Sequence, residues 1–321
     1  MTDRFSRRLL LAQAGAALAA VPSLARAAAP VVAGFPPPPA VQNIQGDADA
    51  QNRLTVETML NDQGPFRFVV DTGADRSVLC DEVVKSLGLA GGDEMIVAGI
   101  ARSLPAPSAR LDRLQVGHVV MRDLALPVLP RRWLGCDGYL GLDVIDRQAV
   151  TFDFVNHRLT VAPSNMVIGW TTVVDGNVVR TSGSNGRLSA VNCRVDGMRA
   201  HAFIDSGAEI SIGNSRLFAE LAEAGGKYID DSVIQLLGVT GGAVEGRVTA
   251  IGNIRLGPIN FVHSALVISD LPVFDVWGLA DRPALFIGMN FLRQTSSVTI
   301  DYGRKELRFR LANNLKLASR A

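Results

Sequence analysis

The sequence predicts an all-β protein built from two homologous lobes with short helices. Strand-like apolar segments bounded by turn residues recur along the body of the chain, and the helical segments between them are short. The segment Asp71–Ala74, Asp-Thr-Gly-Ala, returns as Asp-Ser-Gly-Ala at Asp205–Ala208. The elements around the two copies follow in the same order. A repeat of this length indicates two duplicated lobes and excludes a solenoid.

The composition fits this class. The chain has 321 residues, of which 48% are hydrophobic and 20% charged, so it can form two domains of ordinary size with a sizeable core. The net charge of +1 gives no indication of a nucleic-acid partner or of a membrane-coating surface.

Residues 1–27 are predicted to be a twin-arginine (Tat) signal peptide. Arg7-Arg8 precedes the Ala-rich apolar run Leu9–Val21, and Ala25–Ala27 has the small-x-small pattern of a cleavage site. The apolar run is too short for a comfortable membrane span. We therefore expect a bacterial protein that is periplasmic or secreted after export; an uncleaved anchor in the inner membrane is the alternative.

Residues 28–50 are predicted to be a Pro-rich linker, because Pro36–Pro39 enforces an extended backbone. Gln42–Ala50 is polar, and we expect it to be loose. The N-terminal lobe is then expected over residues 51–165 and the C-terminal lobe over 166–321. The loop-forming run Thr181–Gly186 lies near the junction of the lobes.

Each lobe is expected to begin with a hairpin that leads into its aspartate. The expected strands are Arg53–Leu60 with Phe66–Val70, and Leu188–Val195 with Arg199–Ile204. A short helix follows in each lobe, at Asp81–Leu87 with Asp81 as its N-cap and at Ser215–Ala224 with Asn214 or Ser215 as its N-cap.

The later elements are repeated as well. Two glycine-containing hairpins come next, at Gly91–Gly99 and Val233–Gly246, and further strand–turn–strand segments follow. Gly138–Ile145 then matches Leu285–Leu292, with two apolar residues, a glycine and a short helix in each. Gly141 and Gly288 would let a strand pass closely behind the Asp-containing corner, where a Cβ would collide. Each lobe ends in two more strands.

A single Asp-[Thr/Ser]-Gly corner is typical of a turn. Two such corners that face each other are different. Two nearby carboxylates cannot both ionise easily, so the pair shares a proton. The ionised member can then take a proton from water, while the protonated member donates to a substrate carbonyl. The candidate residues are Asp71 and Asp205 for this chemistry, Thr72 and Ser206 as supporting hydroxyls, and Gly73 and Gly207 for close backbone approach.

The segment Phe68–Leu79, FVVDTGADRSVL, resembles the active-site segment of retropepsins, the retroviral-type aspartic proteases, and the duplication is similar to the two-lobed pepsin plan. This resemblance implies an active site between the lobes, with Asp71 and Asp205 as the catalytic pair. It implies an aspartic endopeptidase that acts on peptide or protein substrates without cofactor or metal, and we expect a monomer. The hairpins at Gly91–Gly99 and Val233–Gly246 would be substrate-covering flaps; plain surface hairpins are the alternative.

The resemblance also implies substrate-binding residues next to each aspartate. These are Ala74 and Asp75 in the first lobe and Ala208 and Glu209 in the second, and a surface charge or local salt bridge is the alternative for the two acids. One feature departs from the retroviral pattern. Retropepsins carry an Arg after the second glycine, where this chain has Leu142 and Met289.

Two other functions compete with the endopeptidase. The fold could serve as a catalytically silent peptide- or partner-binding module, although both aspartates and both hydroxyls are retained. A metal hydrolase using Asp71, Asp75 and Asp205 is disfavoured, because no histidine or further acid ligand lies nearby in the sequence. The three cysteines (Cys80, Cys136 and Cys193) and the four histidines show no metal-binding spacing. Buried thiols are expected, and one disulfide that leaves a third thiol free is the alternative.

Overall fold

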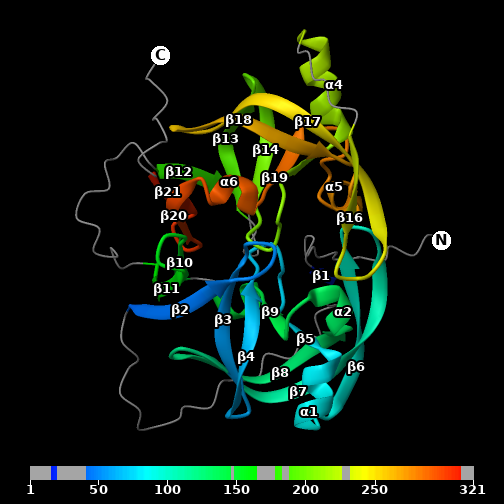
Figure 1. Ribbon diagram of the computed structural model, residues 1–321, viewed down its shortest axis with the longest axis vertical. Coiled ribbons are helices and arrows are strands. Elements are labelled where there is room, and N and C mark those ends of the chain that lie inside the picture. Colours follow the sequence, from blue (N-terminus) through cyan, green and yellow to red (C-terminus); the bar gives the residue numbers. More distant parts are fainter. Residues whose placement is uncertain are drawn as a thin grey trace, which may run out of the picture.

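The computed structural model describes residues 16–19, 41–145, 148–164, 178–182, 188–225 and 232–311. Strands predominate in these ranges and the helices are short, which confirms the predicted all-β class. Two lobes lie one above the other in Figure 1, and the C-terminal ends of β4 (Gln63–Val70) and β14 (Met198–Ile204) approach each other at the centre.

The N-terminal lobe is a strongly curved sheet with three short helices. Its strands are β2 (Gln42–Ala48), β3 (Leu54–Leu60), β4 (Gln63–Val70), β5 (Val78–Cys80), β6 (Gly91–Gly99), β7 (Ser103–Val116), β8 (Val119–Leu129) and β9 (Gly138–Leu140). Its helices are α1 (Asp81–Leu87), α2 (Arg131–Leu134) and α3 (Leu142–Ile145).

The C-terminal lobe repeats this design. Its strands are β13 (Ser189–Val195), β14 (Met198–Ile204), β15 (Ile212–Gly213), β16 (Val233–Leu237), β17 (Ala243–Leu256), β18 (Ile259–Ile268) and β19 (Ala284–Ile287), and its helices are α4 (Ser215–Glu223), α5 (Pro272–Val276) and α6 (Met289–Leu292). In both lobes the strand before the aspartate pairs in parallel with the strand before the second glycine, β4 with β9 and β14 with β19. The duplication predicted from the sequence is therefore present in the strand pairing.

A further sheet joins the lobes. It contains β2, β11 (Arg158–Pro163), β10 (Gln148–Asp153), β20 (Thr295–Asp301), β21 (Glu306–Leu311) and β12 (Val178–Ser182), each paired antiparallel with the next. The lobes meet where β10 pairs with β20, and the hydroxyls of Thr151 and Thr299 are 2.7 Å apart on this seam. The last strands of the two lobes thus hold them together.

Residues 42–48 differ from the prediction of a loose linker, because they form β2. The polar sequence gives little strand signal, but β2 pairs with β11 through one half and with β3 through the other. Gly46 lies at the change of partner, where an added Cβ would be 2.4 Å from the Thr55 carbonyl oxygen. The strand conformation of residues 42–48 is therefore set by pairing with other strands and not by local sequence. Thr181 and Ser182, predicted to be in a loop, end β12 for the same reason and pair with β13.

The cap of α1 also differs from the prediction. Cys80 is the N-cap, and its Sγ accepts from the Val83 amide at 3.4 Å. The Asp81 carboxylate instead accepts from the backbone of Glu82 and Arg131. The predicted cap of α4 is confirmed at Asn214, whose side chain accepts from the Leu217 amide at 2.9 Å.

Most of the predicted leader, the Pro-rich run and the lobe boundary at residues 165–166 lie outside the described residues. Within the leader, β1 (Ala16–Ala19) pairs antiparallel with β6, with Ala17 opposite Ala98. None of the helices in the described ranges combines the length and apolarity that crossing a bilayer requires.

Candidate active site

Asp71 and Asp205 stand at equivalent corners of the two lobes. Asp71 directly follows β4, and its amide donates to the Leu140 carbonyl of β9 at 2.9 Å. Asp205 directly follows β14, and its amide donates to the Ile287 carbonyl of β19 at 3.0 Å. The parallel strand pair beneath each aspartate therefore fixes where its backbone ends.

Each corner orients its own carboxylate through backbone amides. Oδ1 of Asp71 accepts from the amides of Gly73 and Ala74 at 2.8 and 3.2 Å. Oδ1 of Asp205 accepts from Gly207 and Ala208 at 2.9 and 3.1 Å. These bonds leave Oδ2 of each aspartate buried and without a protein hydrogen-bond donor among the described residues.

The hydroxyls of Thr72 and Ser206 tie the two corners together. The amide of Thr72 donates to Ser206 Oγ at 3.1 Å, and the amide of Ser206 donates to Thr72 Oγ1 at 3.0 Å. Each hydroxyl in turn donates to the opposite lobe, Thr72 to the Ile204 carbonyl and Ser206 to the Val70 carbonyl. This reciprocal set of buried bonds fixes one aspartate relative to the other.

The glycines let the two carboxyl groups approach. A Cβ on Gly207 would be 2.4 Å from Asp71 Cγ, and a Cβ on Gly73 would be 2.9 Å from Asp205 Cγ. Each carboxyl group thus packs on the glycine of the other lobe, and the two aspartates face one another within a single chain.

Burial raises the pKa values of both members of this pair. Both side chains are essentially inaccessible to solvent. Burial raises the pKa of Asp71 well above its ordinary value, and the nearby Asp205 raises it further. Burial raises the pKa of Asp205 to about 7, although its backbone hydrogen bonds oppose the shift. The pair can therefore hold one proton near neutral pH.

The second glycines lie directly behind these corners. A Cβ on Gly141 would be 2.5 Å from the Arg76 carbonyl carbon, and one on Gly288 would be 2.8 Å from the Ile210 carbonyl oxygen. In each lobe a serine connects this glycine to its corner: Ser77 Oγ accepts from Gly141 N, and Ser211 Oγ accepts from Gly288 N. Ser77 donates to Asp143 and Ser211 to Asn290. These four supporting side chains were not among the residues predicted from the sequence.

Comparison with known families agrees with this geometry. An aspartyl protease family model matches residues 56–144 and 191–291, one region in each lobe and together more than half of the chain. The chain belongs to the aspartyl protease family. A search of curated proteins returned no match.

A buried cation, Arg53, lies close to Asp71 and Asp205, which are called the dyad below. Arg53 donates to the Asp49 carboxylate at 2.7 Å and to the Tyr139 hydroxyl at 2.5 Å, and its guanidinium carbon is 5.3 Å from the Tyr139 ring centroid. Its positive charge lowers the pKa of both Asp71 and Asp205, against the larger effect of burial. Nothing in the local sequence distinguishes Arg53 from a surface arginine, so its burial could not be predicted.

The two predicted flaps are β-hairpins whose tips touch. β6 and β7 form one hairpin, β16 and β17 the other, and they meet on one side of the boundary between the lobes (Figure 1). Thr240 Oγ1 donates to the Arg102 carbonyl at 2.9 Å, and Arg102 Nε donates to the Thr240 carbonyl at 3.0 Å. The Arg102 guanidinium also lies 5.7 Å from the Trp133 ring centroid. The predicted range Val233–Gly246 contains the turn of the second hairpin, but Gly91–Gly99, predicted as a hairpin, is the single strand β6, and its turn lies beyond Gly99.

The residues implied to bind substrate lie on the dyad loops. Ala74 and Ala208 are buried, Asp75 is half-buried and Glu209 is exposed. The carbonyls of Ala74 and Ala208 accept from the amides of Leu142 and Met289, whose side chains are buried. The positions that carry Arg in retropepsins therefore contribute to the apolar core of this chain.

The three cysteines of the chain are buried free thiols, as expected. Burial raises the pKa of Cys136 to about 11 and that of Cys193 to about 12. Within the described ranges, no group of three or more histidine, cysteine or acidic side chains could hold a metal ion. His201 is exposed at the surface of the C-terminal lobe.

Proposed function

We propose that this protein is an aspartic endopeptidase that hydrolyses peptide bonds by direct attack of water. The observation that carries the proposal is the face-to-face arrangement of Asp71 and Asp205, each buried against the glycine of the opposite lobe. One chain supplies both aspartates, so catalysis needs no second copy.

The proton movements follow from the shared-proton pair, which is the established chemistry of aspartic proteases. The ionised carboxyl takes a proton from water as the water oxygen attacks the peptide carbonyl carbon. The protonated carboxyl donates its proton to the carbonyl oxygen. When the C–N bond breaks, the newly protonated carboxyl donates its proton to the leaving nitrogen, and the other carboxyl takes a proton from a hydroxyl of the tetrahedral intermediate, so the pair again holds one proton.

The surrounding residues have supporting roles in this proposal. Thr72 and Ser206 hold the two carboxyls in register through the bonds between the lobes. The amides of Gly73 and Gly207 orient Oδ1, which directs Oδ2 of each aspartate toward water and substrate. Asp75 and Glu209 are proposed to contact substrate main chain, and the hairpin flaps to cover it.

The pKa of Asp205, about 7, suggests the pH range of activity. A pair that still holds one proton near neutrality can supply both an acid and a base there. We expect activity to extend to near-neutral pH and to fall at alkaline pH, as the second carboxyl ionises. The proposal includes Tat export to the periplasm, supported by the twin arginine and the cleavage pattern of residues 1–27.

The test is digestion of an unfolded protein and of a peptide library by wild type and by Asp71→Asn. The substitution keeps the shape of the side chain, so we expect a folded protein whose activity is lower by about 10²–10⁴-fold. Asp270→Asn, on the surface, is the matched control and should be fully active. Equal cleavage by wild type and Asp71→Asn would refute the proposal. Tight peptide binding without cleavage would instead favour the binding module.

A further inference from the structure

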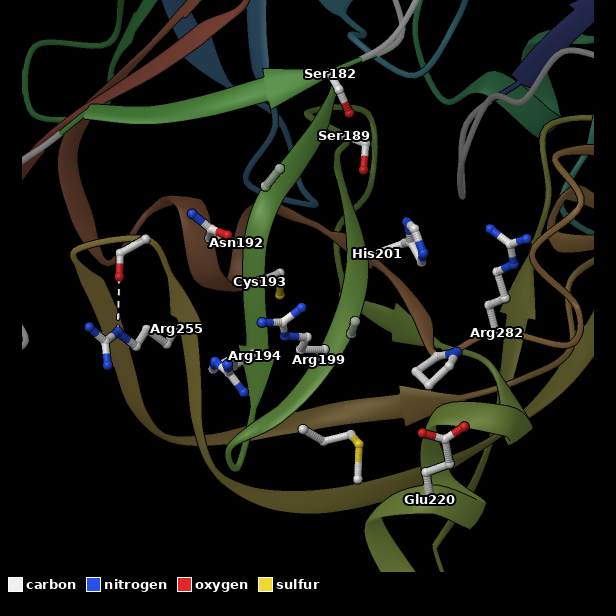
Figure 2. Close-up of a pocket in the computed structure, with 15 residues that line it drawn as sticks. Ser182, Ser189, Asn192, Cys193, Arg194, Arg199, His201, Glu220, Arg255 and Arg282 are labelled. Atoms are coloured by element: carbon white, nitrogen blue, oxygen red, sulfur yellow. Dashed lines mark hydrogen bonds between the residues drawn. The ribbon is translucent and has the colours of Figure 1, made fainter.

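A hollow of about 870 Å³ lies over the β13–β14 hairpin of the C-terminal lobe, and none of its lining residues belongs to the dyad corners. Figure 2 shows its charged lining residues. Four of them are arginines, Arg194, Arg199, Arg255 and Arg282. The hollow is therefore strongly basic, although the chain as a whole has a net charge of only +1.

Three of these arginines occupy a single rung of the sheet. Arg194 of β13 lies directly opposite Arg199 of β14 on one side and Arg255 of β17 on the other. Directly opposite side chains point to the same face, and neighbouring strands are about 4.8 Å apart, so the rung spans roughly 10 Å. Like charges placed in this way destabilise a sheet.

No carboxylate among the described residues forms an ion pair with any of the four arginines. Glu220 is the one acidic residue of the lining, and its Oε1 is bound to Arg216 at 2.7 Å. Two guanidinium groups are oriented by backbone: Arg194 donates to the Gly197 carbonyl at 2.7 Å, and Arg255 to the Gly257 carbonyl at 2.9 Å. Their other N–H groups make no bond to a described residue.

The N-terminal lobe shows that the fold does not need this charge. Met59 lies opposite Gln115 at the place where Arg194 lies opposite Arg255. Gln115 donates to the Gly117 carbonyl at 2.8 Å, which is the same backbone contact that Arg255 makes. An uncharged rung therefore supports the same strand pairing. The arginines of the second lobe need another explanation.

We propose that this hollow binds a small molecule carrying two or three linked phosphate groups. The planar guanidinium group matches phosphate oxygens in bidentate fashion. Three adjacent arginines exceed what a single carboxylate can satisfy, because it offers two oxygens and one charge. Linked phosphates carry about three or four negative charges, which matches four arginines that form no ion pair with a carboxylate in the described part of the chain. The volume falls within the range of small-molecule sites, and a concave site does not suit a flat membrane surface.

Sodium tripolyphosphate is the probe, titrated calorimetrically into the full chain at 150 mM salt, where exposed charges are screened beyond about 8 Å. We expect saturable binding with one molecule per chain. Arg199→Gln should weaken it by about tenfold or more, the effect of losing one charged hydrogen bond. The control is Arg122→Gln, an exposed arginine on β8 that lies opposite Arg113 in the first lobe; it should bind as wild type.

Stability without the probe separates binding from a structural role. Removing Arg199 relieves like-charge repulsion, so Arg199→Gln should unfold at the same temperature as wild type or higher. A drop in its unfolding temperature would show that Arg199 is structural and would overturn the proposal. Absence of saturable binding, equal binding by Arg199→Gln, or tighter binding of a hexaglutamate peptide than of tripolyphosphate would overturn it too.

Discussion

Tyr139 and Phe286 occupy the same place in the two lobes, opposite Val69 and Phe203 on the strands that lead to the aspartates. The Tyr139 hydroxyl accepts from the buried Arg53, whereas Phe286 packs among Phe203, Phe274 and Trp277. The backbone that carries each aspartate is thus repeated, but polar contacts support the first and aromatic packing supports the second.

A second pair differs in the same direction. Asp143 in the first lobe and Asn290 in the second each accept two bonds from a serine through Oδ1. The Asp143 side chain is ionisable, and the Asn290 side chain is not. The comparison teaches that the duplicated fold constrains hydrogen-bond geometry at the corners strictly and the charge behind them only loosely.

The largest expected effect tests whether the two aspartates act as one unit. Asp71→Asn and Asp205→Asn should each lower kcat/KM by about 10²–10⁴-fold, and the double variant should be no worse than either alone, because each step needs both carboxyls. Single-turnover cleavage of one peptide by the three variants measures this. Substantial activity in only one single variant would show that the lobes contribute unequally.

The next effect tests the polar support of the first lobe. Asp49→Ala would leave the Arg53 cation buried and without its carboxylate, which should cost about 3–5 kcal/mol of unfolding free energy. Urea unfolding measures the loss. Asp47→Ala is the matched control, since its contact with Arg67 is exposed and 3.8 Å long, and it should cost less than about 1 kcal/mol. Equal losses in the two variants would contradict the role assigned to Arg53.

Gly141→Ala and Gly288→Ala test the close approach behind the two corners. In both lobes the added Cβ would collide with backbone that cannot rotate away, so each should lower the unfolding free energy by about 1–3 kcal/mol. Gly141→Ala should lower the unfolding free energy more than Gly288→Ala, because the atom nearest to its added Cβ is closer. Gly91→Ala meets nothing within 4 Å and should be nearly neutral by thermal unfolding. An unchanged unfolding free energy in Gly141→Ala would mean that Gly141 lies farther from the Asp71 corner than in this structure.

The smallest effect concerns the Asp143–Asn290 difference. Burial raises the pKa of Asp143 above its unfolded value, so the stability that its protonated form contributes is complete at low pH and is lost as pH rises through the raised pKa. Asp143→Asn removes this dependence. Relative to wild type, the variant should gain up to about 1 kcal/mol between pH 4 and pH 7.5. Urea unfolding at both pH values measures this difference in unfolding free energy. A variant that is less stable relative to wild type at pH 7.5 than at pH 4 would contradict the prediction.

Much of the candidate site could be predicted from the chain alone. The two Asp-[Thr/Ser]-Gly corners, the hairpins before them and the glycines behind them follow from local residue chemistry, because turns, glycines and apolar strands leave local signals. Asp81, predicted as the cap of α1, shows the limit of such signals. Its carboxylate bonds Arg131 instead, an interaction 50 residues away that nothing near Asp81 indicates.

The sequence by itself determined the class, the duplication and the identity of the paired aspartates. Tertiary structure alone decided that residues 42–48 form a strand, that Arg53 is buried, and that Arg194 and Arg255 share a rung. Each of these depends on the pairing of segments far apart in the chain. Strand register sets which side chains meet, and no local pattern of residues encodes that register.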